Sequence, residues 1–190
     1  LLKQAKDEQL SVFDNDNKTT KVKVDYKIID ENKVDSLIKK LKVQKEICFD
    51  TETSSLDIQS AKLAGIAFSC EEGKAYYVPT LSNTEEILKK LSPLFSDSNI
   101  LLIGHNLKYD IQILSKYGIL FHENVFDTML AHYVISPEGS QKLDVLSENY
   151  LNHKCIPIED VIGKKGVNQM SMIDIPVENV YEYACEDADI

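Results

Sequence analysis

The sequence predicts one mixed α/β domain whose sheet starts antiparallel and finishes parallel, with helices around it. With 190 residues, 43% of them hydrophobic, the chain is long enough for one sizeable core. Two β-like runs, 62–69 and 74–79, flank a short turn that contains Gly73, a pattern typical of a hairpin. The continuous apolar run 99–104 indicates a fully buried strand, and mainly helical patterns follow it.

The first half of the chain alternates strand and helix signals. Residues 1–20 are polar and aperiodic, which predicts a linker or tail from a preceding region. A short strand is expected at 26–29. Asp30 or Asn32 is then expected to cap a helix whose apolar residues recur at helical spacing, namely Val34, Leu37, Ile38 and Leu41. The strand 46–52 and the hairpin follow.

The second half is mainly helical. Thr84 begins a helix that is expected to stop near Pro93, because proline cannot continue the hydrogen-bonding pattern. A short strand is expected near Val125. Helical patterns cover four further segments, 107–117, 127–135, 142–151 and 177–190.

Charge and composition limit the classes of partner. A formal net charge of −10 argues against a free-standing domain that grips duplex DNA by charge neutralisation. It is compatible with a site that reaches phosphates through bound cations, or with a domain that relies on a neighbour for affinity.

No stretch approaches a membrane span and no signal peptide leads the chain, so we expect no membrane contact and a cytoplasmic protein.

The four cysteines are widely scattered and include no C-x-x-C pair; they are Cys48, Cys70, Cys155 and Cys185. This spacing predicts reduced, mostly buried thiols rather than a disulfide framework or a zinc site.

Asp50 and Glu52 close the apolar strand 46–52. Alternate side chains of a strand share one face, so the two carboxylates lie side by side. Two adjacent acids repel each other and are costly to desolvate unless a cation lies between them, which suggests a divalent metal site. The alternative is a solvated strand end followed by a polar turn, a common context for D-x-E.

Two further acidic segments follow. Asn106 is placed to cap the helix after strand 99–104, which puts Asp110 at the end of the first turn. Asp110 could equally be a surface acid matched to the helix dipole. Tyr183 and Asp187 are four residues apart on the last helix and so share a face, where they could hold a water or ligand. The alternative is an ordinary amphipathic helix with Tyr183 in the core.

Together these segments resemble the three exonuclease motifs of the DEDD superfamily, in the subclass with a tyrosine. They read FDTETSSLD (49–57), GHNLKYD (104–110) and YACEDAD (183–189). The intervening segments FDTMLAHYV (126–134), KLDVLSENYLNHK (142–154) and GKKGVNQM (163–170) also resemble this family. The match, over about 24–190, most resembles the proofreading domain of bacterial family A DNA polymerases, the DNA polymerase I family.

The resemblance implies an RNase H-like fold and a site for two divalent metal ions. Mg²⁺ is expected, with Mn²⁺ or Zn²⁺ as other options, because hard cations prefer oxygen ligands. The implied ligands are Asp50, Glu52, Asp110 and Asp187, with Asp50 bridging the metals and Tyr183 orienting the attacking water.

The resemblance also implies residues that touch the substrate. Leu56, Asn106 and Thr51 correspond to positions beside the bound strand, and Leu56 could otherwise be a core residue. Ile158 stands where relatives can carry an aromatic residue, so a base contact there is less expected.

The function implied is 3′→5′ exonucleolytic proofreading within a DNA polymerase I. Two-metal hydrolysis would release 5′-mononucleotides from single-stranded or frayed 3′ ends of DNA. The exonuclease domain is expected at 21–190, in a monomer that begins at Leu1 as a piece of a longer protein and ends before a polymerase domain of the same polypeptide. The alternatives are a stand-alone DEDD exonuclease acting on RNA, and a catalytically silent spacer that only positions a polymerase.

Other polar residues have simpler explanations. Asp127 opens a helix and is expected to be an N-cap. The histidines show no ligand spacing; they are His105, His122, His132 and His153. Three lysines could touch phosphates, although solvated lysines are common at such positions; they are Lys142, Lys164 and Lys165.

Overall fold

The computed structural model describes residues 23–190, so the linker or tail expected at 1–20 lies outside the described residues. Its strands are β1 (Asp25–Ile28), β2 (Glu46–Thr53), β3 (Leu63–Glu71), β4 (Lys74–Pro79), β5 (Leu101–Gly104) and β6 (Val125–Asp127). Its α-helices are α2 (Val34–Leu41), α3 (Thr84–Phe95), α4 (Leu107–Ser115), α5 (Thr128–Ile135), α6 (Leu143–Leu151), α7 (Ile158–Ile162) and α8 (Val177–Asp189). Two 3₁₀ helices complete the list, η1 (Glu31–Lys33) and η2 (Met172–Asp174).

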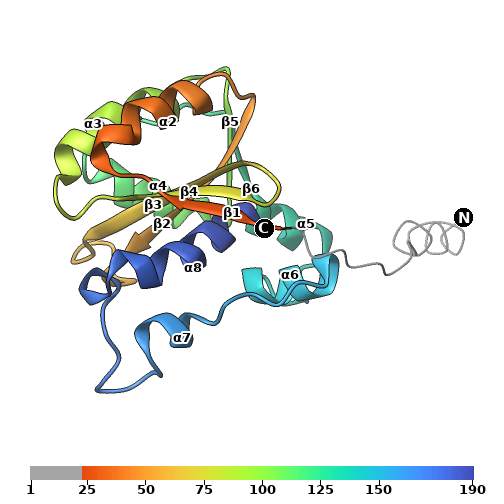
Figure 1. Ribbon diagram of the computed structural model, residues 1–190. Coiled ribbons are helices and arrows are strands. Elements are labelled where there is room, and N and C mark those ends of the chain that lie inside the picture. Colours follow the sequence, from red (N-terminus) through yellow and green to blue (C-terminus); the bar gives the residue numbers. More distant parts are fainter. Residues whose placement is uncertain (1–22) are drawn as a thin grey trace, which may run out of the picture.

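The described strands form one six-stranded sheet in the order β1-β4-β3-β2-β5-β6 (Figure 1). Strands β2, β3 and β4 form an antiparallel meander, while β5 and β6 join β2 in parallel, which confirms the predicted mixed sheet. The edge strand β1 runs parallel to β4, so the first strand in the chain departs from an antiparallel start.

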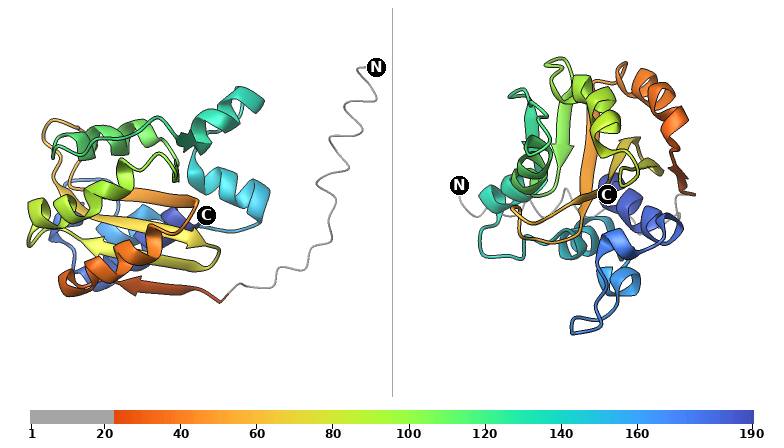
Figure 2. Two further views of the ribbon diagram at one scale, coloured as in Figure 1. Left: turned by 90° about the horizontal axis from the view of Figure 1, so that it is seen from above. Right: turned by 90° about the vertical axis from the view of Figure 1, so that its left-hand side faces the viewer.

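Helices cover both faces of the sheet (Figure 2). On one face α2, α3 and α4 enclose the larger core, in which Phe49, Phe68 and Phe95 are buried. On the other face α8 packs against β3 and β4, with Tyr77 and Cys185 in a second cluster. Burial on both faces explains why β3 reads as an almost continuous apolar run rather than an alternating one.

One helix boundary agrees with expectation and one differs. Helix α3 ends at Phe95, near Pro93 as expected, because the proline removes one hydrogen bond of the last turn, while Leu94 and Phe95 are buried in the core. Helix α2 begins at Val34 after η1, and its predicted apolar residues are all buried. Neither proposed cap acts there: Asp30 makes no capping bond and instead pairs with Lys33 at 2.8 Å.

The short helices and the cysteines also differ from the prediction. The short helices α7 and η2 had no distinct sequence signal. All four cysteines are free, but only Cys185 is buried, so the expectation of mostly buried thiols was wrong. No helix in residues 23–190 has both the length and the apolar character that crossing a membrane requires.

Candidate metal centre

Strand β2 carries Asp50 and Glu52 near the middle of the sheet, between β3 and β5. Asp50 is opposite Ala67 and Glu52 is opposite Gly65 on β3. The Tyr77 ring occupies the space that a Cβ at position 65 would need, so a glycine is required there. The small residues therefore leave the space beside Glu52 to a tyrosine from the next strand.

Helix α8 brings the third acid. One oxygen each from Asp50, Glu52 and Asp187 lies within 4.8 Å of the others, so the three carboxylates can share one cation. Within residues 23–190 this is the only group of three such ligand side chains, and it contains no histidine. Tyr183, one turn earlier on α8, donates a hydrogen bond to Asp187.

Burial, reinforced by nearby carboxylates, disfavours the charged form of each of the three acids. Burial, together with the charges of the neighbouring Asp187 and Asp110, raises the pKa of Glu52 to about 8. Burial likewise raises the pKa of Asp187 to about 7, although the Tyr183 hydrogen bond opposes the shift. The pKa of Asp50 is also well above its usual range, through burial and the charges of Asp110 and Glu52. The metal-free site therefore holds protons that a cation would displace.

Asp110 stands next to this group rather than within it. It is 3% exposed, on the first turn of α4, and its Oδ1 accepts hydrogen bonds from the backbone N–H of Thr51 at 3.1 Å and from Thr51 Oγ1 at 2.5 Å. Burial raises the pKa of Asp110 to about 7 while the bonds from Thr51 oppose the shift. Thr51 lies between Asp50 and Glu52 on β2, so its two hydrogen bonds to Asp110 connect α4 to this strand.

The donor set fits a hard divalent cation. Glu52 is 6% exposed, and its Oε1 has no hydrogen-bond partner among residues 23–190. A buried carboxylate oxygen without a partner is costly, and a cation between three carboxylates would satisfy it. All candidate donors are oxygens, which suits Mg²⁺ or Mn²⁺.

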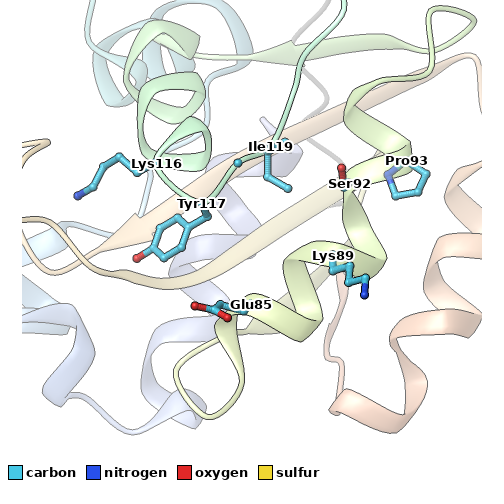
Figure 3. Close-up of a pocket in the computed structure, with 8 residues that line it drawn as sticks. Glu85, Lys89, Ser92, Pro93, Lys116, Tyr117 and Ile119 are labelled. Carbon is cyan, nitrogen blue, oxygen red and sulfur yellow. The ribbon is translucent and has the colours of Figure 1, made fainter.

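A pocket of about 340 Å³ opens beside the acids, between α6, the segment 154–158 and α8. Tyr183 and Asp187 form one wall, and Leu143, Ile156 and Ile158 supply apolar surface. A larger cavity of about 570 Å³ lies between α3 and the end of α4 (Figure 3), but no candidate acid lines it. Chemistry rather than size therefore marks the smaller pocket as the candidate substrate site.

The expected substrate-binding residues lie in different settings. Leu56 is 89% exposed on the loop between β2 and β3, so it is not a core residue. Thr51 is buried, with its hydroxyl bound to Asp110. Asn106 occupies the N-cap position of α4 but makes no side-chain capping bond, which corrects that expectation. Its backbone is left-handed (φ 63°), and its N–H donates to Asp127 at 3.2 Å instead.

Asp127 is the N-cap of α5, as predicted, because its side chain accepts from the N–H groups of Met129 and Leu130. Lys142, Lys164 and Lys165 are exposed.

Two acids of the last helix were overlooked in the sequence. The buried Glu186 accepts from His153 Nε2 at 2.8 Å and from the Ile156 N–H at 2.5 Å. Asp189 accepts from Tyr26 at 2.9 Å and from the Gly73 N–H at 3.0 Å. Acids near a helix C-terminus interact unfavourably with the helix dipole. Their position in the sequence therefore indicated that Glu186 and Asp189 have stabilising partners.

The fold and the acidic group define an RNase H-like domain with a carboxylate site for divalent metal, built on a central strand and closed by the C-terminal helix. Solved structures share this fold. RNase D from Escherichia coli, an exoribonuclease involved in structured RNA processing, superposes with a TM-score of 0.69 at 16% identity, over 87% of this chain and 42% of that one. The POL domain of Pol1 from M. smegmatis, solved with DNA primer-template and dNTP, gives a TM-score of 0.63 at 19% identity, over 86% and 26%.

Sequence comparison places the chain more narrowly. A family model described as 3′-5′ exonuclease matches residues 26–190, and the chain belongs to this family. DNA polymerase I of Pseudomonas aeruginosa is 36% identical over 180 residues, covering 88% of this chain and 20% of the relative. DNA polymerase I of Borreliella burgdorferi is 42% identical over 163 residues, covering 83% and 17%. The chain thus spans about a fifth of the length of these relatives. Membership implies hydrolytic nuclease chemistry that uses divalent metal ions.

Proposed function

We propose that the chain is the proofreading module of a DNA polymerase I, which removes nucleotides from single-stranded or frayed 3′ ends of DNA and releases 5′-mononucleotides. The observation that carries this proposal is the group of three carboxylates with an unpartnered buried Glu52 oxygen. Because relatives of this chain are named DNA polymerase I, we propose DNA rather than RNA as its substrate. Their greater length supports a polymerase domain in the same polypeptide, and we place this monomeric module in the cytoplasm with its DNA.

Asp50, Glu52 and Asp187 would hold one Mg²⁺, and Asp110, fixed by Thr51, would serve a second that also touches Asp50. Bound metal ions would lower the pKa of the attacking water and stabilise the departing 3′ oxygen. The preference for Mg²⁺ over Mn²⁺ or Zn²⁺ follows from the all-oxygen donor set.

Tyr183 would orient the water without deprotonating it. Burial and the adjacent Asp187 raise the pKa of this phenol far above its usual range. A phenol in that state keeps its proton at neutral pH, so it donates a hydrogen bond and cannot act as a general base.

The pocket beside Tyr183 would receive the terminal nucleotide. Its apolar wall suits a base or sugar, and Ile158, 45% exposed, lies at the rim. Leu56 would pack against the terminal base and Asn106 would lie beside the bound strand. The exposed Lys142, Lys164 and Lys165 would contact phosphates further along the strand.

The test is hydrolysis of a 5′-labelled single-stranded DNA oligonucleotide in Mg²⁺ or Mn²⁺, with an EDTA control and a matched RNA oligonucleotide. We expect stepwise shortening from the 3′ end, with DNA degraded faster than RNA. Asp50→Ala should abolish shortening, whereas Glu178→Ala, at an exposed position of α8, should leave it unchanged. Near-normal rates in Asp50→Ala would refute the site, and an inactive wild type would support a silent spacer.

A further inference from the structure

The loop between β2 and β3, residues 54–62, is held by side chains of α4 and of the residue that follows it. We call it the Leu56 loop. Its two ends are joined by backbone hydrogen bonding between Ser54 N–H and Lys62 O at 2.9 Å, and by a bond from the Lys62 N–H to Ser54 Oγ at 2.9 Å. Asp57 closes an internal turn by accepting from Ser60 Oγ at 2.6 Å. The loop therefore has a defined shape, although it lies at the surface.

Lys116, which directly follows α4, binds the backbone of this loop. Its Nζ donates to three carbonyl oxygens, those of Ile58 at 2.5 Å, Ala61 at 2.8 Å and Gln59 at 3.1 Å. An ammonium group has three N–H donors, so all three are used by the loop. Lys116 therefore has no donor left for a DNA phosphate, unlike an ordinary surface lysine.

Helix α4 holds the same loop at a second point. The hydroxyl of Tyr109 donates to Ser55 O at 2.6 Å, next to Leu56. Asp110, the following residue, is the acid bound to Thr51 beside the candidate metal centre. Helix α4 and the adjoining Lys116 therefore connect the Leu56 loop to the acids, and Leu56 projects from that loop with 89% of its surface exposed.

We propose that Lys116 is a positioning residue for substrate binding, whose ammonium group holds the Leu56 loop in the conformation that presents Leu56 to the 3′-terminal base. This inference rests on the proposed function. A large apolar side chain on a fixed loop is an effective contact surface for a base, because it loses little conformational freedom on binding. Releasing the three carbonyls would leave Leu56 present but mobile, and that freedom would have to be lost each time the substrate binds.

The test compares Lys116→Met with Lys89→Met. Lys89 lies on α3 and lines the opposite side of the same cavity as Lys116 (Figure 3), so its replacement removes an equal charge from that cavity without releasing the loop. KM and kcat are measured on a short single-stranded DNA oligonucleotide in Mg²⁺, below the melting temperature of both variants. We expect Lys116→Met to raise KM by about three- to tenfold, with kcat within about twofold of wild type, and Lys89→Met to change neither.

A double variant tests whether the effect passes through Leu56. Leu56→Ala should raise KM by itself, and adding Lys116→Met should raise it by less than about twofold more, because the side chain being positioned is already gone. Full additivity, an equal rise in KM for Lys89→Met, or an unchanged KM for Lys116→Met would each overturn the proposal.

Equilibrium binding separates this inference from the proposed function. The dissociation constant of a fluorescein-labelled oligonucleotide is measured by anisotropy in Ca²⁺ for the same variants, and the same pattern is expected. If the wild type bound the oligonucleotide but did not hydrolyse it in Mg²⁺ or Mn²⁺, the proposed function would fail. The dissociation constants of the variants would still test whether Lys116 positions the Leu56 loop. Undetectable binding by the wild type would overturn the inference.

Discussion

Replacing Glu52 by glutamine should stabilise the metal-free protein at pH 8, although it removes a candidate metal ligand. Burial raises the pKa of Glu52 from 4.5 to about 8. The folded protein binds the Glu52 proton more tightly than the unfolded chain does. The stabilisation that this proton gives is fully present below pH 4.5 and is lost as the pH rises through about 8. A shift of this size corresponds to a few kcal/mol, at about 1.4 kcal/mol per pKa unit.

Glutamine removes this pH-dependent loss. Its amide can donate to the carboxylates of Asp50 and Asp187, whose oxygens lie within 4.8 Å in the same group. Allowing for the cost of burying the amide, we expect a net gain of roughly 1–3 kcal/mol at pH 8. For a chain of this size that gain raises the melting temperature by about 2–4 °C per kcal/mol.

The assay is thermal unfolding in EDTA and in Mn²⁺, at pH 5.5 and pH 8. The gain in EDTA should shrink at pH 5.5, where Glu52 of the folded wild type is already protonated. Mn²⁺ should stabilise the wild type at pH 8, by about 2.7 kcal/mol at a hundredfold excess over its dissociation constant, and should stabilise Glu52→Gln much less. Glu178→Gln, the same change at an exposed position, should alter neither melting temperature.

Two results would refute this reasoning. If Glu52→Gln melted below the wild type in EDTA at pH 8, the charge on Glu52 would not be the source of the instability. If Mn²⁺ stabilised both proteins equally, Glu52 would not be a ligand.

Three further predictions concern hydrolysis and binding. Tyr183→Phe should leave a slower activity, by about 10–100-fold in kcat, that still requires metal; complete loss would assign the phenol a larger role than orienting water. Thr51→Val removes the hydroxyl bond to Asp110 but not the backbone one, so we expect about a tenfold lower rate at pH 7 that partly recovers at pH 9; a pH-independent loss would contradict this. Alanine at both Lys164 and Lys165 should weaken binding of single-stranded DNA and reduce its salt slope by up to about two, and an unchanged slope would exclude phosphate contact.

The local signals in the sequence predicted most of the fold. Apolar residues at helical spacing identified α2 correctly, because burial against the sheet dictates that spacing. The end of α3 near Pro93 was predictable because proline removes a hydrogen bond of the helix, and the burial of Leu94 and Phe95 sets the exact end at Phe95. No local pattern could show that β1 would pair with β4, since the partner of an edge strand is chosen by tertiary packing.

The candidate site was predictable where strand or helix periodicity governs it. Alternation along β2 placed Asp50 and Glu52 together, and spacing on α8 placed Tyr183 beside Asp187. The bond between Thr51 and Asp110 depends on how α4 meets β2, which periodicity does not contain. Lys116 showed no signal, because a lysine that binds three carbonyls looks like any surface lysine in a sequence.

The bond between Tyr26 and Asp189 joins residues 163 positions apart, so it has a consequence for the order in which the domain assembles during synthesis. A nascent chain that has emerged as far as residue 170 contains all six strands of the described sheet, yet it lacks α8 and with it Asp187. Closing so long a loop is slow compared with forming the β2–β3–β4 meander. The three acids therefore meet only after α8 has left the ribosome, and until then the unfinished chain lacks the complete candidate metal centre.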